Sequence, residues 1–292
     1  MTFIVILIAW VLLQRLGPDF MRAHDRWLEA WQMRGSAALS VVPVRIRLLL
    51  LAGLPGALVA LLAWVVSPWL AGLWLLLLDL LVLAYSLGRG NYRAELDNYL
   101  ERWQRGDLEA AYQVAQQSFG RGLNGEEDLS ADSAQQLHQQ MRRAALYTGL
   151  ERWFAVVFWF ALLGPGLALT YRLLHLLRQQ AAPDIPERMW LAQWLEWLDW
   201  LPARLLGLAF AIIGDFVSCM RSWRDHFFGQ HSVRDLLVIY AERSVPHAEA
   251  GVRELGDEHF VELAAHEIRE LRDLMRRSTM CWLVALALLQ MI

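Results

Sequence analysis

The stretch LLLLAGLPGALVALLAWVV at residues 48–66 holds 19 residues without a charge. An α-helix needs roughly 20 apolar residues to cross a bilayer, so this run has the length of a transmembrane helix. Ser67 and Pro68 interrupt it, and residues 69–87 then form a second apolar run whose one charge is Asp79. A proline in so short a break is typical of a turn between antiparallel helices. The two runs predict a transmembrane hairpin, either fully spanning or partly re-entrant.

Four further apolar segments are candidates for membrane helices. Two of them are short for a span, and a Gly-Pro-Gly sequence inside a third predicts a kink. The fourth reaches the length of a span only if the flanking Arg204 and Asp215 are accommodated near the membrane surface. These segments are residues 1–14, 278–292, 153–171 and 205–220. The sequence therefore predicts an all-α fold, a polytopic membrane helix bundle of about five transmembrane helices that forms a single domain over residues 1–292.

The distribution of arginine predicts which side of the membrane each loop occupies, because cytoplasmic loops carry an excess of basic residues. If residues 205–220 cross the membrane, three Arg-rich segments share one side and hold 23 arginines, against four on the other side. Those three segments are 14–47, 88–152 and 221–278, and 172–204 lies opposite them. Without that crossing the split is 14 against 13. The first arrangement follows the positive-inside rule, so we expect the three Arg-rich segments to be cytoplasmic.

The composition limits the classes of function. The 292 residues are 57% hydrophobic and carry a formal net charge of −3, and no concentrated basic region indicates a nucleic-acid partner. All 27 basic residues are arginine. P-loop NTPases and pyridoxal-phosphate enzymes are excluded, because both need lysine. The two cysteines, Cys219 and Cys281, lie far apart, so neither a disulfide framework nor a zinc ribbon is expected.

Amphipathic helices are expected in the cytoplasmic segments 88–152 and 221–277. Asp107 has the position of an N-cap, and Ser232 with Asp235 forms a capping box before the next helix. Apolar residues recur at helical spacing in the first segment, at Leu96, Leu100 and Trp103. A second stripe on the opposite side of the membrane predicts a helix in the headgroup region, at Trp190, Trp194, Trp197 and Leu201.

Asp79 is the strongest single candidate for a functional residue. A carboxylate in the middle of a membrane helix costs roughly 2.5–3.5 kcal/mol on insertion scales, so such a residue usually faces other helices. It could bind a ligand, proton or ion, or form a structural hydrogen bond, and the sequence leaves both interpretations open. Arg89, Asn91 and Arg93 follow the hairpin and could hold an anionic head group or phosphate, but ordinary cytoplasmic arginine explains them equally well.

Other polar patterns favour no catalytic or metal site. Four ionisable residues share one predicted helix face without forming an HExxH motif, and a solvated charged face explains them better. They are His259, Glu262, His266 and Glu270. The glycine-rich turn at 120–125 matches neither GxGxxG nor Walker A, and no spacing nominates a Ser-His-Asp set. We expect no metal, no cofactor and no catalytic residue.

Three strings in the chain resemble the AmpE family, bacterial inner-membrane proteins associated with the regulation of β-lactamase induction. They are RGDLEAA (105–111), FWFALLGPGLALTYRLL (158–174) and LDWLPARLLGLAFAIIGDF (198–216). The same strings resemble the larger superfamily of cobinamide-phosphate synthases, which join an amino-alcohol unit to a corrinoid carboxylate with ATP. The length and the short terminal helices also fit the AmpE family.

The polar positions of a synthase are mostly replaced in this chain. The residues at those positions are Gly122, Leu123, Tyr147, Thr148, Glu151, Leu174, His175, Leu195, Glu196 and Asp199. Losing carboxylates and amides that would orient ATP, metal and substrate should remove the activity. The resemblance therefore implies a synthase-like membrane scaffold without the synthase chemistry.

The AmpE resemblance implies a non-catalytic, multi-pass regulator of the bacterial inner membrane, linked to cell-wall recycling, β-lactamase induction and antibiotic resistance. Its implied partners are the lipid bilayer and a cytosolic muropeptide amidase that docks on the cytoplasmic helices. The alternative is a membrane-embedded enzyme or ligand-binding protein with a remodelled phosphate or nucleotide pocket. The residues that would line such a pocket are Asp79, Arg89, Asn91, Asp107, Glu151, Arg172 and Arg204.

Overall fold

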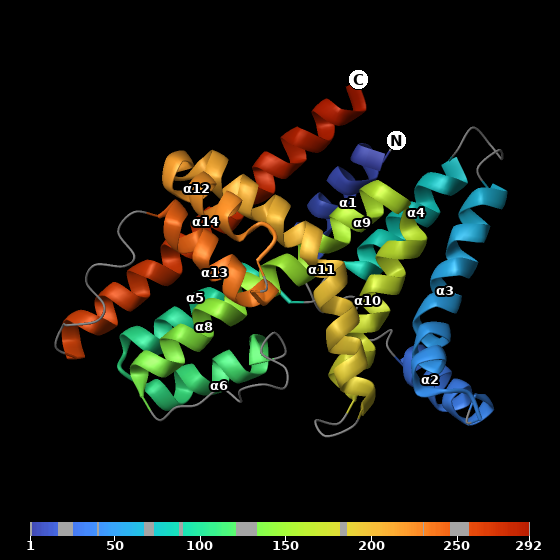
Figure 1. Cartoon of the computed structure of the whole chain (residues 1–292), viewed down its shortest axis with the longest axis horizontal. Coiled ribbons are helices and arrows are strands. Elements are labelled where there is room, and N and C mark those ends of the chain that lie inside the picture. Colours follow the sequence, from blue (N-terminus) through green and yellow to red (C-terminus); the bar gives the residue numbers. More distant parts are fainter. Residues whose placement is uncertain are drawn as a thin grey trace. The chain divides into compact units, whose positions relative to one another are not determined.

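The computed structural model of the chain is helical (Figure 1). It describes residues 2–16, 26–39, 41–66, 73–87, 90–120, 133–181, 186–229, 231–245 and 257–291. No strand occurs among these residues, so the predicted all-α fold class is confirmed. The helices are α1 (Thr2–Leu16), α2 (Arg26–Ala38), α3 (Val44–Val66), α4 (Leu73–Ser86), α5 (Tyr92–Gln104), α6 (Leu108–Ser118), α8 (Ala134–Gly149), the π-helical η3 (Leu150–Phe154), α9 (Ala155–Leu163), α10 (Pro165–Gln180), α11 (Pro186–Ile213), α12 (Phe216–His226), α13 (Val233–Ser244) and α14 (Asp257–Met291).

The helices form two compact units, where the sequence predicted a single domain. The first unit consists of residues 1–90 and 152–198, and the second unit of residues 91–151 and 199–292. Each unit therefore combines two segments that are distant in the sequence. The second unit contains most of two of the three segments that the arginine distribution predicts to be cytoplasmic, and the third segment, 14–47, belongs to the first unit.

The first unit is built around α10, which packs against α3, α4 and α9. Gly56 on α3 and Gly166 on α10 allow the closest approach. A Cβ built on Gly56 would lie 2.5 Å from the Gly166 carbonyl oxygen and 2.0 Å from Thr170 Oγ1. Only glycine at both positions lets the two backbones meet at this distance.

A large apolar surface remains exposed on the first unit. On α3 and α4 the exposed side chains are Leu49, Leu54, Leu58, Leu61, Leu62, Trp64, Val65, Leu73, Trp74, Leu77 and Leu81. Soluble monomers rarely expose apolar surface on this scale, whereas a lipid-facing helix does. Among the described residues, two helical stretches could cross a membrane by length and composition, Val44–Val65 and Ala134–Leu163. Two shorter apolar helices are Thr2–Leu12 and Leu73–Ser86.

The predicted membrane helix 153–171 is divided into two helices. Helix α9 ends at Leu163, and α10 begins at Pro165. Gly164 between them has a φ of +80°, a conformation that favours glycine, and Pro165 occupies the first position of α10, where no backbone N–H is needed. The Gly-Pro-Gly sequence therefore breaks the helix instead of kinking it.

The predicted segment 205–220 is also broken. The residues of the tryptophan stripe and the apolar residues after Arg204 form one helix, α11, which ends at Ile213. The Asp215 side chain accepts hydrogen bonds from the backbone N–H groups of Val217 and Ser218, which starts α12. The N-cap aspartate therefore divides the candidate segment 205–220 between α11 and α12.

The second unit confirms the amphipathic helices that the sequence predicted. Leu96, Leu100 and Trp103 on α5 are buried, and Trp103 Nε1 donates a hydrogen bond to the carbonyl of Val261 on α14. Asp107 caps α6 by accepting from the Ala110 N–H. Ser232 likewise accepts from the Asp235 N–H at the start of α13, which the capping box predicted. Helix α14 runs without interruption through the last predicted membrane segment.

Candidate functional site

Helix α14 contains a carboxylate within an apolar stripe. Residues at i, i+4, i+7, i+11 and i+14 form its buried face, and the third of them is ionisable. They are Phe260, Ala264, Glu267, Leu271 and Leu274, with Glu267 only 5% exposed. A carboxylate in such a position is very costly to bury unless it is paired, so the structure must supply partners.

His138 on α8 is the first partner of Glu267. Its Nε2 lies 2.5 Å from Glu267 Oε2, and the imidazole is 2% exposed. The ring centroids of Trp103 and Phe260 each lie 6.0 Å from the centroid of the imidazole, so aromatic side chains surround the pair. His138 Nδ1 is buried and has no hydrogen-bond partner within the described part of the chain. The pair links α8 directly to α14 inside the second unit.

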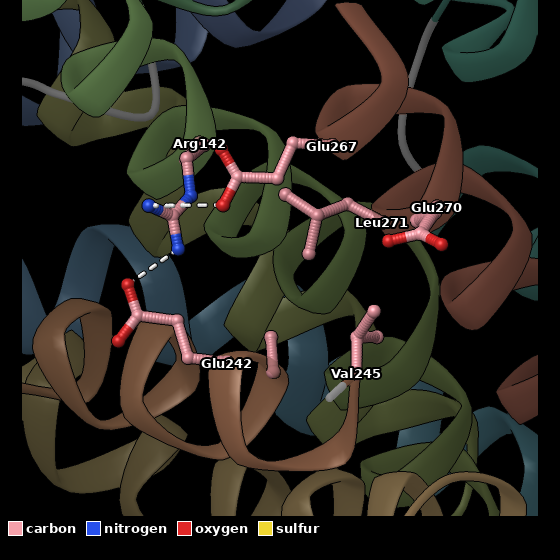
Figure 2. Close-up of a pocket in the computed structure, with 7 residues that line it drawn as sticks. Arg142, Glu242, Val245, Glu267, Glu270 and Leu271 are labelled. Atoms are coloured by element: carbon pink, nitrogen blue, oxygen red, sulfur yellow. Dashed lines mark hydrogen bonds and ion pairs between the residues drawn. The ribbon is translucent and has the colours of Figure 1, made fainter. Parts of the chain in front are cut away.

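Arg142, one turn further along α8, extends the cluster to α13. Its guanidinium forms an ion pair with Glu242 on α13, and its Nη1 lies 3.4 Å from Glu267 Oε1. Figure 2 shows the arginine between these two carboxylates, with Glu270 directed away from it. A small pocket lies beside the cluster, and its other lining residues are Ala241, Val245, Glu270 and Leu271. The polar cluster His138–Arg142–Glu242–Glu267 therefore joins three helices.

The chemistry of this polar cluster is that of a structural junction. It contains no Ser, Thr, Cys or Lys side chain, and no group of three or more His, Cys, Asp or Glu side chains in the described ranges could hold a metal ion. Its charged side chains are held in place by their ion pairs and by burial. Removal of one partner from such a network leaves an uncompensated charge. Ionic junctions of this kind bias a structure towards one arrangement, which suits a regulated contact between helices.

Tyr99 lies next to the same aromatic side chains. Its ring stacks on Trp103 with centroids 5.8 Å apart, and its hydroxyl has no hydrogen-bond partner among the residues described. Burial raises the pKa of Tyr99 above its ordinary value, so the phenol stays neutral at physiological pH. It contributes packing to the cluster and no charge.

The residues predicted for a phosphate pocket are divided between the two units. Asp79 and Arg172 belong to the first unit, whereas Asn91, Asp107, Glu151 and Arg204 belong to the second. Arg89 lies outside the described residues. Asn91 and Asp107 are exposed and act as N-caps, Asn91 by accepting from the Ala94 N–H. Their side chains therefore serve local helix structure.

Arg204 has a structural role that its sequence context did not indicate. It is 1% exposed, and it donates from Nε to the Phe227 carbonyl at 2.6 Å and from Nη1 to the Trp200 carbonyl at 3.0 Å. The guanidinium also lies 4.0 Å from the centre of the Trp200 ring. It holds the end of α12 against α11. Glu151 and Arg172 are buried as well.

Asp79 lies half-buried on α4. Its Oδ1 is shielded from solvent and has no hydrogen-bond partner among the described residues. The interpretation of Asp79 as a structural hydrogen bond between helices therefore gains no support from this oxygen.

The charged face of α14 is solvated, as the sequence favoured. Glu262 and His266 are exposed, and His266 Nδ1 lies 3.7 Å from Glu270 Oε1. The sequence pattern singled out this face and missed Glu267 on the buried face beside it. The available signal was the position of Glu267 at the centre of the apolar stripe, where an unpaired carboxylate would be unstable. Most of the glycine-rich turn at 120–125 lies outside the described residues.

Comparison with known protein families gives one match of wide extent. A family model described as "Regulatory signalling modulator protein AmpE" matches residues 1–251 of the chain. The match includes every described helix except α14, so it covers both units. No curated protein and no solved structure matches the chain. The resemblance to the cobinamide-phosphate synthases stays a prediction from sequence.

Proposed function

The chain belongs to the AmpE family of regulatory signalling modulator proteins, and on this basis we propose that it is a non-catalytic regulator of β-lactamase induction in the bacterial inner membrane. The observation that carries the proposal is the family match over residues 1–251. The polar cluster is compatible with it, because that cluster connects three helices of the second unit.

Multi-pass insertion is supported by the exposed surface of the first unit. The leucines and tryptophans of α3 and α4 point away from their own unit, as lipid-facing side chains do. Helix α4, with 14 residues, is about 21 Å long and shorter than the hydrocarbon core of a bilayer, roughly 30 Å. A partly re-entrant hairpin remains one interpretation of α3 and α4.

A cytoplasmic location of the second unit is supported by contacts between its two segments. Trp103 donates to Val261, His138 pairs with Glu267, and Arg142 pairs with Glu242. Polar segments in direct contact share one side of the membrane, because a charged helix is not stable within the hydrocarbon core. These contacts favour an arrangement in which the segments 88–152 and 221–278 share one side of the membrane.

The second unit is then the part of the molecule that a cytosolic partner can reach. We propose a muropeptide amidase as that partner, docking on the charged helices α5 and α14. The ion pair between Arg272 on α14 and Asp97 on α5 joins these two helices, so the two helices offer one continuous surface to a partner. The alternative, a remodelled phosphate pocket, gains no support, since Asn91 and Asp107 are occupied as helix caps.

Deletion of the gene should alter β-lactamase induction and leave cobalamin synthesis intact. We expect induction to change in the deletion strain and to return with the wild-type gene, whereas the strain should grow without supplied cobalamin. A synthase site that has lost several members acting together should lose nearly all its rate. Growth of a synthase-deficient strain on this gene alone would instead establish the enzyme alternative.

Replacing Asp79 by leucine should lower regulatory activity while the protein still inserts. No described group is bonded to Oδ1, so the substitution should leave the thermal unfolding temperature unchanged or slightly raised. Membrane fractionation measures insertion, and thermal unfolding in detergent measures stability. Complementation of the deletion strain measures regulatory activity. Full complementation at unchanged stability would show that the carboxylate is incidental.

A further inference from the structure

Helix α12 carries an exposed stripe of apolar and basic side chains. The stripe consists of Val217, Arg221 and Arg224 on α12, which recur at i, i+4 and i+7, and of Phe228 in the turn that follows the helix; all four side chains are exposed. Val217 is 67% and Phe228 87% exposed. Phe216 at the start of α12 is 53% exposed as well. Such solvent exposure of large apolar side chains at both ends of one stripe indicates a surface that is covered by a lipid bilayer or by another molecule.

The rotation of α12 about its axis is fixed by its opposite face. Cys219 is buried, with Sγ 3.7 Å from the Gly207 carbonyl oxygen and 3.5 Å from that of Tyr240. Trp223 Nε1 donates a hydrogen bond of 2.8 Å to the carbonyl of Arg204. These contacts seat α12 on α11 and α13, so the stripe points away from the second unit.

The two arginines of the stripe are available for an anionic ligand. Within the described ranges, no carboxylate forms an ion pair with Arg221 or Arg224, although Asp225 lies beside the stripe on the same helix. Cations flanked by apolar side chains at helical spacing are the pattern of a helix that lies in the headgroup region, with arginine at the phosphates and apolar groups at the acyl boundary.

We propose that α12 is a membrane-surface helix that binds an anionic lipid surface through Arg221 and Arg224, with Val217 and Phe228 inserted at the acyl boundary. The proposal rests on the proposed membrane location of the protein. It gives a role to the break at Asp215, since a helix that starts anew there can lie along the surface instead of crossing it. Docking of α12 would hold α11 and α13 next to the bilayer.

Lipid quenching of fluorophores on the full-length protein tests this proposal. The background carries Cys219→Ala and Cys281→Ala, and single cysteines at positions 217 and 228 receive a small fluorophore. Position 58 on α3 serves as the membrane control, and the exposed position 262 on α14 as the solvent control. Each variant is reconstituted in phosphatidylcholine vesicles with or without phosphatidylglycerol, containing lipids brominated near the headgroup end of the acyl chain.

We expect quenching at 217 and 228 in the anionic vesicles, at 58 in both vesicles, and at 262 in neither. Arg221→Gln with Arg224→Gln should weaken docking about thirtyfold, since each arginine near an anionic surface contributes roughly fivefold.

Quenching at 58 without quenching at 217 and 228 would overturn the surface helix and retain the membrane location. Absence of quenching at 58 would overturn the membrane location itself. Quenching at 217 and 228 that ignores phosphatidylglycerol and both arginines would overturn headgroup binding.

Discussion

Replacing Glu267 by alanine should destabilise the second unit by ~3–5 kcal/mol. The substitution leaves Arg142 with one carboxylate partner in place of two, and it removes the partner that His138 Nε2 has among the described residues. Thermal unfolding in detergent measures the loss, and hydrogen exchange should localise it to α8 and α14. The apolar stripe on either side of Glu267 offers no substitute for the lost charge.

Glu262→Ala is the matched control for this substitution, because it removes an exposed carboxylate from the same helix. It should change stability by no more than ~0.5 kcal/mol. A double replacement, His138→Leu with Glu267→Leu, should cost less than Glu267→Ala alone, since apolar side chains can replace a buried pair. Equal stability of the Glu262→Ala and Glu267→Ala proteins would contradict the role given to the polar cluster.

Replacing Gly56 by alanine should separate α3 from α10 in the first unit. The added methyl group would lie 2.5 Å from a backbone oxygen of Gly166, which cannot move without moving α10. Overpacking of this kind typically costs ~1–3 kcal/mol, and a fixed backbone atom places the site at the upper end. Thermal unfolding in detergent and resistance to proteolysis measure the effect.

Gly53→Ala on the same helix is the control, because nothing lies within 4 Å of its added Cβ. Its stability should stay unchanged or rise by up to ~1 kcal/mol, the ordinary gain of alanine over glycine in a helix. Truncation of Thr170 in the Gly56→Ala background should restore stability in part only, since the Gly166 carbonyl remains. A Gly56→Ala protein as stable as the Gly53→Ala protein would show that the two helices are not held in close contact.

Local signals in the sequence predicted much of this fold. Asp107 and Ser232 mark the starts of α6 and α13, because a short polar side chain can satisfy the first backbone N–H groups of a helix. The same rule applies at Asp215, whose side chain caps α12 although apolar residues surround it in the sequence. Gly164 is a second break of this kind, since a glycine with positive φ followed by proline ends a helix.

The polar cluster could not be predicted in full from the sequence. Its members lie on α8, α13 and α14, and only the tertiary packing brings His138 and Arg142 next to Glu267. Periodicity could have shown that Glu267 falls on a buried face, but it could not identify the partner. The residues predicted for a pocket stay a prediction for the same reason, because their likeness to a motif carries no information on three-dimensional proximity.

Accessibility of single cysteines from the two sides of the membrane tests the central claim most directly. The claim is that the first unit is embedded in the membrane and that the second unit, assembled from two distant segments of the chain, is cytoplasmic. In a background without Cys219 and Cys281, cysteines at positions 121, 143 and 253 should react with an impermeant reagent only after the cytoplasmic side is opened, and position 194 should react from outside. Labelling of position 253 from the periplasmic side of intact cells, with position 143 still protected, would contradict the account.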